Sequence, residues 1–248
     1  MERDEYQRLF ATDDQLWWFR GRWDVLARTL RSAFAGVPTK PLVLDAGCGT
    51  GANLVHLKQL ARSVGIDVSS DALAFAKQRV AGQLVRGSVL VLPFRDAAFD
   101  AVISNDVLYH QWVTDDVAAL KELARVLKPG GIVLVHVAAM EMFRGSHDVV
   151  NLTRHRYTIG EMRQKMQEVG LEVQRVTYRN SLLAPVLLAR RWLHRKGSSS
   201  DSGSDLAVQA AWLNNSLTCV LKLENALLRF TNLPIGSSVF AVGRKRAA

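Results

Sequence analysis

The sequence predicts an α/β fold with a doubly wound, mostly parallel sheet, and two observations predict it. Short apolar runs alternate with helical patterns from residue 42 to residue 178, which is typical of a parallel sheet with helices on both faces. The run Ile132 to Val137 is almost wholly apolar, as expected of a central strand that is covered on both faces. A chain of 248 residues, 48% of them hydrophobic, can bury a core of this size, so an intrinsically disordered protein is excluded.

The predicted elements follow one another along the chain. A glycine turn follows the first strand and opens a helix that runs to about Ala61. Ser69 or Ser70 caps the next helix. A further helix runs from about Asp115 to Leu127, where Lys-Pro-Gly-Gly stops it. Seven strands are expected in all, near residues 42–45, 64–67, 83–86, 99–104, 132–137, 172–178 and 238–242.

The flanks of the sheet predict three further parts around a core at residues 39–179. Residues 1–38 are expected to form an N-terminal helical lid, because residues 17–19 (Trp-Trp-Phe) are more aromatic than a surface helix requires. Residues 180–234 are expected to form a helical cap insertion with a flexible Gly/Ser linker at 197–204 and a long helix from Asp205 to about Phe230. Residues 235–248 supply the last strand and a basic tail.

The positive charge of the chain is uneven. The formal net charge is +9, and residues 1–140 hold 16 Lys and Arg against 15 Asp and Glu, whereas residues 141–248 hold 16 against 8. A polyanion or an anionic surface could therefore meet the second half. Solvated arginine side chains explain the excess equally well.

The segment 181–196 is apolar and then basic, and it allows three interpretations. It could be a helix on an anionic membrane, a cap over a substrate pocket, or a dimer face. Because it lies between the last two predicted strands, we prefer the cap. Peripheral membrane contact and a homodimer stay open.

The sequence also predicts a cellular location. No run of 18 apolar residues could span a bilayer. The first five residues carry charges of both signs and no apolar signal segment follows them. Two cysteines cannot form the disulfide framework of a secreted protein of this length. We therefore expect a cytoplasmic protein, with a peripheral position at the inner membrane face as the variant of that expectation.

A glycine-rich motif closes the first predicted strand and carries the chemistry. The residues 45–51 read Asp-Ala-Gly-Cys-Gly-Thr-Gly and lead into a helix. Glycines let a ligand lie against the main chain, and the free N–H groups of the helix start bind polar ligand atoms. Asp67 ends the second strand, where an acidic side chain can hold the hydroxyls of an adenosine ribose. This arrangement suits either NAD or S-adenosylmethionine. Asp45 favours S-adenosylmethionine, because a carboxylate at the strand end suits its cationic groups and repels a pyrophosphate.

Further motifs distinguish the two cofactors by resemblance. The chain contains VLDAGCGTG, GID, LPF, FDAV and LKPGG in this order between about residues 40 and 140. It thereby resembles the class I S-adenosylmethionine-dependent methyltransferases, in particular their small-molecule, type 11 branch. The resemblance implies a Rossmann-like fold, S-adenosyl-L-methionine as cofactor and S-adenosyl-L-homocysteine as product.

The resemblance also assigns residues to the cofactor. Asp45 and the glycine turn would line its methionine end, Asp67 would hold the ribose, and the residues after the fourth strand would close over it. Ser88 stands where the family usually has an aspartate that binds the adenine amino group, so Ser88 or the backbone of Val89 must replace it. The implied cofactor-binding set is Arg22, Asp45, Gly47, Cys48, Gly49, Gly51, Asn53, Asp67, Val68, Ser88, Val89, Asn105, Asp106 and Val107.

Residues outside these core motifs resemble a bacterial subgroup of the same family. A Trp-Trp-Phe-Arg-Gly-Arg start, His147-Asp148, Arg156-Tyr157-Thr158 and the run 178–183 (YRNSLL) carry this resemblance. His155 stands where the subgroup usually has arginine. The subgroup is associated with glycan, lipid and secondary-metabolite pathways, so the resemblance does not fix the acceptor.

A hydroxyl acceptor requires a base that takes its proton. His110 follows the fourth strand, and His147 and Asp148 follow the fifth, where substrate loops of such sheets lie. We therefore predict His110, His147, Asp148 and Tyr157 as catalytic candidates. His136 lies inside a strand, and we interpret it as a hydrogen-bonded core residue. No Cys/His spacing indicates a metal site.

We therefore expect a methyltransferase that acts on a small-molecule or lipid- or glycan-linked acceptor, first by O-methylation and next by N- or C-methylation. No Asn/Asp-Pro-Pro-Tyr motif occurs, so a nucleic-acid acceptor is less expected than a small molecule, although the basic second half of the chain keeps RNA open. Two alternatives stay open: an NAD(P)-dependent oxidoreductase and a cofactor-binding partner subunit without catalysis.

Overall fold

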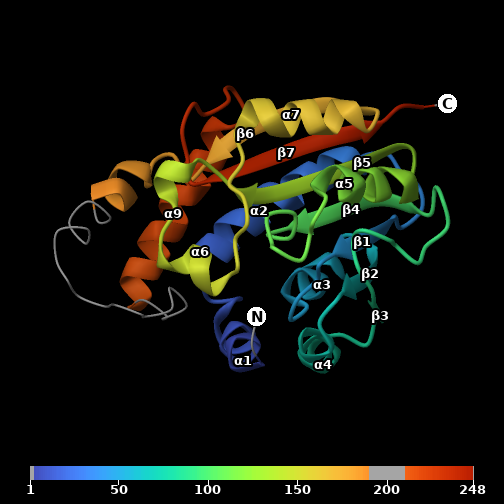
Figure 1. The fold of residues 1–248 in the computed structure, drawn as a ribbon, viewed down its shortest axis with the longest axis horizontal. Helices are drawn as coiled ribbons and strands as arrows, with labels where there is room; N and C mark the ends of the chain where they lie inside the picture. The colour runs from blue at the N-terminus through green and yellow to red at the C-terminus, as the bar shows by residue number, and fades with distance from the viewer. Residues whose placement is uncertain (1–2, 190–209, 248) are drawn as a thin grey trace.

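The computed structural model describes residues 3–189 and 210–247, except for the side chains of residues 146 and 147. One seven-stranded sheet with helices on both faces forms its centre (Figure 1). The strand order is β3-β2-β1-β4-β5-β7-β6, and the bounds are β1 Leu42–Ala46, β2 Arg62–Asp67, β3 Gln83–Arg86, β4 Phe99–Asn105, β5 Leu127–Ala138, β6 Leu171–Arg179 and β7 Ser238–Lys245. The predicted α/β, Rossmann-like fold is confirmed.

The sheet is parallel except for its last strand in sequence. β7 enters between β5 and β6 and is antiparallel to both. The helices are α1 Arg3–Thr12, α2 Trp17–Ala33, α3 Ala52–Leu57, α4 Ser70–Arg79, α5 Asp116–Val126, α6 Ser146–Val150, α7 Ile159–Glu168 and α9 Ala211–Leu227, with a 3-10 turn at Glu141–Phe143. Residues 184–189 are also helical.

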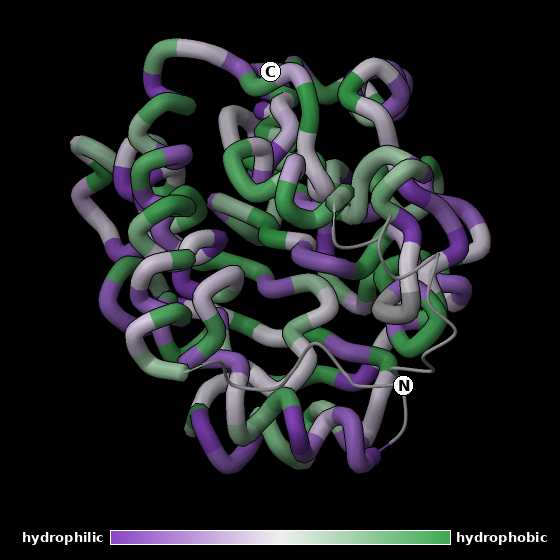
Figure 2. Tube along the Cα trace, turned by 90° about the vertical axis from the view of Figure 1, so that its left-hand side faces the viewer, coloured by the Kyte–Doolittle hydropathy of each residue, from purple (hydrophilic) through white to green (hydrophobic). Residues whose placement is uncertain are grey.

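Two hydrophobic clusters hold the layers together. On one face of the sheet, Leu123 of α5 and Met162 of α7 pack with Val135 of β5. On the other face, Leu30 of α2 and Leu134 of β5 belong to one cluster with residues of α3. Figure 2 shows hydrophobic residues recurring along the strands in the middle of the molecule and hydrophilic residues along the outer helices.

The two N-terminal helices differ in how firmly they are held. α2 buries seven residues, among them Phe19, Leu26 and Leu30, because its apolar stripe faces the sheet. α1 buries none and lies beside α4 (Figure 1). α2 is therefore a layer of the core, and only α1 is a peripheral helix.

Some boundaries differ from those expected. The helix after the glycine turn ends at Leu57 rather than near Ala61. β5 begins at Leu127 rather than Ile132, because Leu127 already pairs with Phe99 and the Lys-Pro-Gly-Gly run belongs to the strand. The expected linker at 197–204 and the first part of the expected helix from residue 205 lie outside the described residues. In the described part of the chain, no helix is long and apolar enough to cross a membrane.

Candidate functional site

The strand order brings several polar side chains to one edge of the sheet. β1 lies between β2 and β4, and ligands of such sheets bind at the carboxyl ends of the strands where the strand order reverses. Asp45 lies near the end of β1, Asp67 ends β2, and Asn105 ends β4 and is followed by Asp106. These four side chains come from distant parts of the sequence and meet because the strands are parallel.

The glycine turn after β1 has the backbone that the sequence predicts. Gly47 has a φ of +85°, which favours glycine, and its N–H donates to the carbonyl of Ile66 at 2.8 Å. A Cβ on Gly47 would lie 2.1 Å from Cγ2 of Val107. The segment after β4 therefore approaches the glycine turn so closely that a side chain is excluded.

Asp67 fixes the two loops that follow β1 and β2. Its carboxylate accepts hydrogen bonds from the N–H of Gly49 and of Ser69, both at 2.9 Å. Burial raises the pKa of Asp67, and these backbone donors offset part of that rise. Each carboxylate oxygen can accept a further donor, so Asp67 remains able to bind a ribose hydroxyl.

Asp45 is fully buried and poorly paired. Its Oδ1 receives one long hydrogen bond of 3.4 Å from the Asn53 amide, and its Oδ2 has no partner among the described residues. Burial raises the pKa of Asp45 to about 7, although Asn53 and Arg22 lower it in part. A buried carboxylate without a partner is costly, and a cationic ligand group would remove that cost.

Arg22 reaches this edge from α2. Its guanidinium forms an ion pair with Asp106, and its Nε is buried without a partner in the described part of the chain. The guanidinium carbon lies 5.2 Å from the centroid of the Trp18 ring and 5.3 Å from that of Phe19. These distances are within the range of cation–π contacts. The aromatic residues that suggested a lid therefore fix Arg22 against the sheet edge.

The unpartnered atoms fit a zwitterionic amino acid. Asp45 and Asn53 each leave a buried oxygen that could accept from an ammonium group, and Arg22 leaves a buried N–H that could donate to a carboxylate. Buried polar atoms are paired in almost all folded proteins, so this set indicates a missing polar ligand. The methionine part of S-adenosylmethionine carries both charges, and the residues present fit it.

Asp106 also contacts a residue that the sequence analysis assigned to the core. Nδ1 of His136 on β5 lies 3.1 Å from Oδ1 of Asp106. The His136 side chain is 9% exposed, and Nε2 makes no hydrogen bond with any described residue. Burial lowers the pKa of His136, and Asp106 offsets this in part, so burial favours the neutral ring. The sequence analysis missed this aspartate–histidine pair, because Asp106 follows β4 and His136 lies on β5. Two residues so far apart in the chain leave no local sequence signal.

The pKa of Asp106 has the opposite shift. Burial alone would raise this pKa, but the Arg22 guanidinium and the His136 ring hold it well below its ordinary value. Asp106 has a positive φ of 58°, which is uncommon outside glycine. The carboxylate is thus ionised and oriented toward both partners.

The remaining cofactor candidates are less engaged. Val68 is exposed, Val89 is buried, and Ser88 accepts a hydrogen bond from the N–H of Leu90 at 3.2 Å. Cys48 is buried, and this burial raises the pKa of its thiol, so it is no nucleophile. Both amide atoms of Asn105 are buried without a partner among the described residues.

Two of the catalytic candidates, Tyr157 and Asp148, are buried and hydrogen-bonded within the fold. Tyr157 is fully buried, and its hydroxyl donates to the Asp116 carboxylate at 2.6 Å. Asp148 is buried and receives a hydrogen bond from Arg156 at 2.6 Å. Each of these two side chains therefore has a charged partner within the fold.

His110 and His147 complete the catalytic candidates. His110 lies after β4, and burial lowers its pKa. Its Nδ1 has no partner in the part of the chain that is described. His147 lies on α6, and its side chain is outside the described residues. The catalytic roles of all four candidates stay predictions.

A family comparison identifies the central segment. A family model described as "Methyltransferase domain" matches residues 44–135, from β1 to β5. Residues 44–135 are therefore similar to a methyltransferase domain, and this segment is called the methyltransferase domain below. This methyltransferase domain contains the glycine turn, Asp67 and Asp106, whereas Arg22 and His136 lie outside it.

Curated relatives share the methyltransferase domain but not the whole chain. The mouse probable tRNA methyltransferase 9B is 42% identical over 101 residues, which are 40% of this chain and 22% of the relative. The malonyl-[acyl-carrier protein] O-methyltransferase of Yersinia pestis is 40% identical over 40% of this chain and 37% of its own length. A probable S-adenosylmethionine-dependent methyltransferase of Mycolicibacterium smegmatis is 30% identical over 65% of this chain and 62% of its own length.

Solved structures share the fold of the methyltransferase domain and its flanks. A chain from the complex between the Haloferax volcanii Trm112 methyltransferase activator and a methyltransferase is 22% identical, with a TM-score of 0.59, over 100% of this chain and 99% of that one. Haemonchus contortus phosphoethanolamine N-methyltransferase 2 in complex with S-adenosyl-L-methionine is 20% identical, with a TM-score of 0.59, over 90% and 52%.

These relatives correct one expectation. The absence of an Asn/Asp-Pro-Pro-Tyr motif suggested that nucleic acid is not the acceptor, yet relatives from mouse and Xenopus tropicalis are named as tRNA methyltransferases, and a structural neighbour comes from a complex with a methyltransferase activator. That expectation is wrong. The physical reason is that one short motif marks only one way of binding a base, so its absence does not exclude a nucleic-acid acceptor.

Proposed function

We propose that the chain binds S-adenosylmethionine between the glycine turn and α2 and transfers its methyl group to an oxygen acceptor. The observation that carries the proposal is the set of buried, unpartnered atoms on Asp45, Asn53 and Arg22. In this proposal residues 39–179 form the cofactor-binding core, and residues 235–248 complete the sheet. Of residues 1–38, α1 contributes the lid and α2 the layer that carries Arg22. Residues 180–234 cap the acceptor side.

Each charged part of the cofactor has a counterpart in the chain. Asp45 and Asn53 accept from the ammonium group, and Nε of Arg22 donates to the carboxylate. Asp67 accepts from a ribose hydroxyl while it keeps its bonds to the Gly49 and Ser69 amides. The adenine lies beside Val68, Ser88 and Val89, as the family resemblance implies.

Proton transfer is the second task of the site. When bound, S-adenosylmethionine supplies a methyl group on a positively charged sulfur. Nε2 of His136 would take the proton that an acceptor hydroxyl loses when it is methylated. Asp106 holds Nδ1–H of the same ring at 3.1 Å and stabilises the imidazolium that forms.

Oxygen as the methylated atom is supported by two observations. A neutral histidine with a free Nε2 and a carboxylate behind it is the arrangement that a hydroxyl acceptor requires. One relative is itself named as an O-methyltransferase. N-methylation and C-methylation of a soft nucleophile would not require the Asp106–His136 pair.

The cofactor part of the proposal is tested by an isosteric substitution. Asp45→Asn removes the charge and keeps the shape, so S-adenosylhomocysteine should bind roughly 10- to 100-fold more weakly, as expected for one charge-assisted hydrogen bond. Equilibrium dialysis measures the affinity. Asp71→Asn, a half-exposed carboxylate of α4, is the matched control and should bind as the unaltered chain does. Equal affinity in Asp45→Asn would contradict the assignment.

The acceptor is sought by methyl transfer from tritiated S-adenosylmethionine. Three fractions are offered: small metabolites, total lipids and total RNA. We expect one fraction to gain an O-methyl product that mass spectrometry identifies, and His136→Asn to lower kcat by roughly 100- to 10,000-fold, the range for loss of a general base. His155→Asn, which removes a half-exposed ring paired with Glu161, controls for a general histidine effect. An N- or C-methyl product, or full kcat in His136→Asn, would contradict this part.

A further inference from the structure

A buried carboxylate at the turn between α1 and α2 is not explained by the proposed reaction. Asp13 is only 4% exposed. Its Oδ2 accepts the hydroxyl of Thr50 at 2.7 Å, and Arg79 donates to both of its oxygens at 2.7 and 3.0 Å. The N–H of Asp14 also donates to Oδ1, at 2.8 Å. Four donors on one buried carboxylate form a strong, directional junction, because hydrogen bonds to ionised groups are about twice as strong as neutral ones.

The same junction holds α1 in place. Arg79 of α4 donates to the carbonyl of Phe10, and its guanidinium carbon lies 4.4 Å from the centroid of the Phe10 ring. The Phe10 ring in turn lies 5.2 Å from that of Phe75. α1 buries no residue fully, and of its apolar side chains Leu9 packs against the cluster of Leu16, Phe19 and Ala52, so the polar contacts at its end contribute much of what holds it in place.

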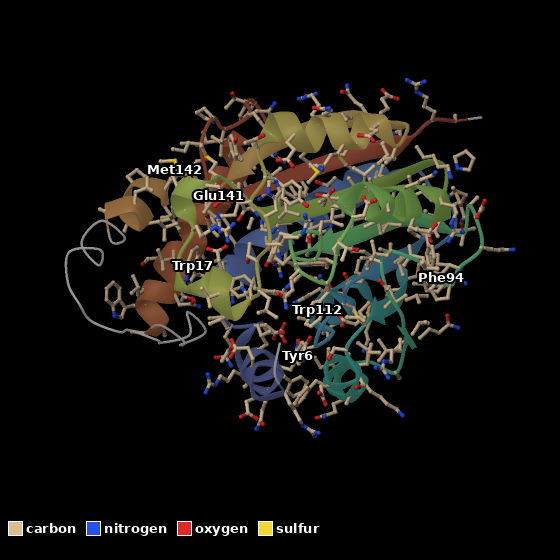
Figure 3. All side chains as sticks on the ribbon, viewed as in Figure 1. Tyr6, Trp17, Phe94, Trp112, Glu141 and Met142 are labelled. Atoms are coloured by element: carbon tan, nitrogen blue, oxygen red, sulfur yellow. The ribbon has the colours of Figure 1, made fainter. Side chains whose placement is uncertain are left out.

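α1 also reaches the loop after β2. The Tyr6 hydroxyl forms a hydrogen bond with the side chain of Ser69, and Figure 3 shows Tyr6 between α1 and α4. The N–H of Ser69 is one of the two donors to Asp67. Thr50, the partner of Asp13, stands between two glycines of the turn after β1. The helix therefore contacts both loops that border the adenosine end of the site.

We propose that Asp13 is a positioning residue that, through Thr50 and Arg79, latches α1 over the loops after β1 and β2 and so controls release of the cofactor product. The inference rests on the proposed function, since it concerns the same ligand. Its consequence is kinetic. With the latch closed, α1 lies across the adenosine end of the site, and S-adenosylhomocysteine leaves only after the Asp13 junction opens.

The test uses the full chain, S-adenosylhomocysteine and two substitutions at Thr50. Thr50→Val removes the hydroxyl at constant shape, and Thr50→Ser restores it. Stopped-flow tryptophan fluorescence, which Trp17 and Trp18 at the start of α2 can supply, measures the release rate after a chase with excess sinefungin. We expect release to be about ten-fold faster in Thr50→Val, as for loss of one hydrogen bond to a charged group, and unchanged in Thr50→Ser.

Two further measurements separate a latch from a general loss of stability. Hydrogen exchange of residues 3–12 in the S-adenosylhomocysteine complex should be faster in Thr50→Val than in the unaltered chain. The double variant Asp13→Asn/Thr50→Val should release the ligand at least as fast as Thr50→Val alone, because both lack the bond from the hydroxyl of residue 50 to residue 13. Asp14→Asn, a half-exposed neighbour, should behave as the unaltered chain.

The possible results are distinct. If the unaltered chain does not bind S-adenosylhomocysteine, the proposed function itself fails. If it binds, but Thr50→Val releases the ligand at the normal rate, the latch is wrong and the proposed function stands. If Thr50→Ser, which keeps the hydroxyl, releases the ligand as fast as Thr50→Val does, the latch is also wrong. The faster release would then come from packing in the glycine turn. The Thr50 variants decide the question even if Asp13→Asn does not fold.

Discussion

The ionisation of Asp45 predicts how ligand binding depends on pH. Burial raises the pKa of Asp45 to about 7 in the free chain. An ammonium group binds the ionised carboxylate, so affinity should be greatest above pH 7. Below that pH, each unit of further acidification leaves about ten-fold less ionised carboxylate, and the affinity for S-adenosylhomocysteine should fall by about ten-fold per unit.

The same shift sets a cost in stability. A carboxyl group whose pKa is higher in the folded chain than in the unfolded chain destabilises the fold once the unfolded chain ionises. The loss of stability caused by Asp45 therefore grows as the pH rises from about 4 to 7 and is constant above that. A rise from 3.8 to about 7 corresponds to about 4 kcal/mol at 1.36 kcal/mol per unit. Asp45→Asn should therefore melt at a higher temperature than the unaltered free chain at pH 7.5, while it binds the ligand less well.

Calorimetric titration with S-adenosylhomocysteine between pH 5.5 and 7.5 measures the binding effect, and thermal denaturation over the same range measures the stability effect. The ligand ammonium stays charged throughout this range, so Asp45 dominates the slope. The Asp45→Asn variant should show a much flatter dependence. A flat profile in the unaltered chain, or an Asp45→Asn variant that melts lower at pH 7.5, would refute the reasoning.

Three further substitutions test the packing around the site. Gly47→Ala should abolish S-adenosylhomocysteine binding in dialysis, because a Cβ there would lie 2.1 Å from a neighbouring side chain, whereas Gly36→Ala, at a φ of +79° with nothing within 4 Å, should lower the melting temperature slightly and leave binding intact. Tyr157→Phe should cost roughly 1.5–3 kcal/mol in denaturant unfolding, because the buried Asp116 carboxylate loses a hydrogen bond of 2.6 Å; an unchanged midpoint would be evidence against this. Glu224→Gln should lower the free energy of unfolding by about 3–5 kcal/mol, since it leaves the fully buried guanidinium of Arg179 without its counter-charge. A loss below about 1 kcal/mol by the same assay would contradict this prediction.

The fold and the cofactor edge were predictable from sequence because their signals are local. Apolar runs separated by helical patterns predicted all seven strands, and the strand ends predicted where Asp45 and Asp67 would meet. Ser69 was expected to cap the helix at residues 70–79, and its side chain does accept the N–H of Ala72. Such features depend on residues within a few positions of one another.

The features that the sequence did not predict depend on long-range pairing. His136 was interpreted as a core residue because its strand is apolar, and its contact with Asp106 spans 30 positions. The bond between Thr50 and Asp13 spans 37. Tyr157 was predicted as a catalytic candidate, and its bond to Asp116 of α5 spans 41 positions. Spacing alone carries no information on any of these pairs.

The most direct test of the account is a side-by-side calorimetric titration of the full chain with S-adenosylhomocysteine and with NADH at pH 7.5. The unpartnered oxygen of Asp45 and the free Nε of Arg22 predict roughly micromolar binding of S-adenosylhomocysteine and none of NADH. Binding of NADH, or the absence of any heat with S-adenosylhomocysteine, would contradict the central claim that this edge of the sheet holds a methyl donor.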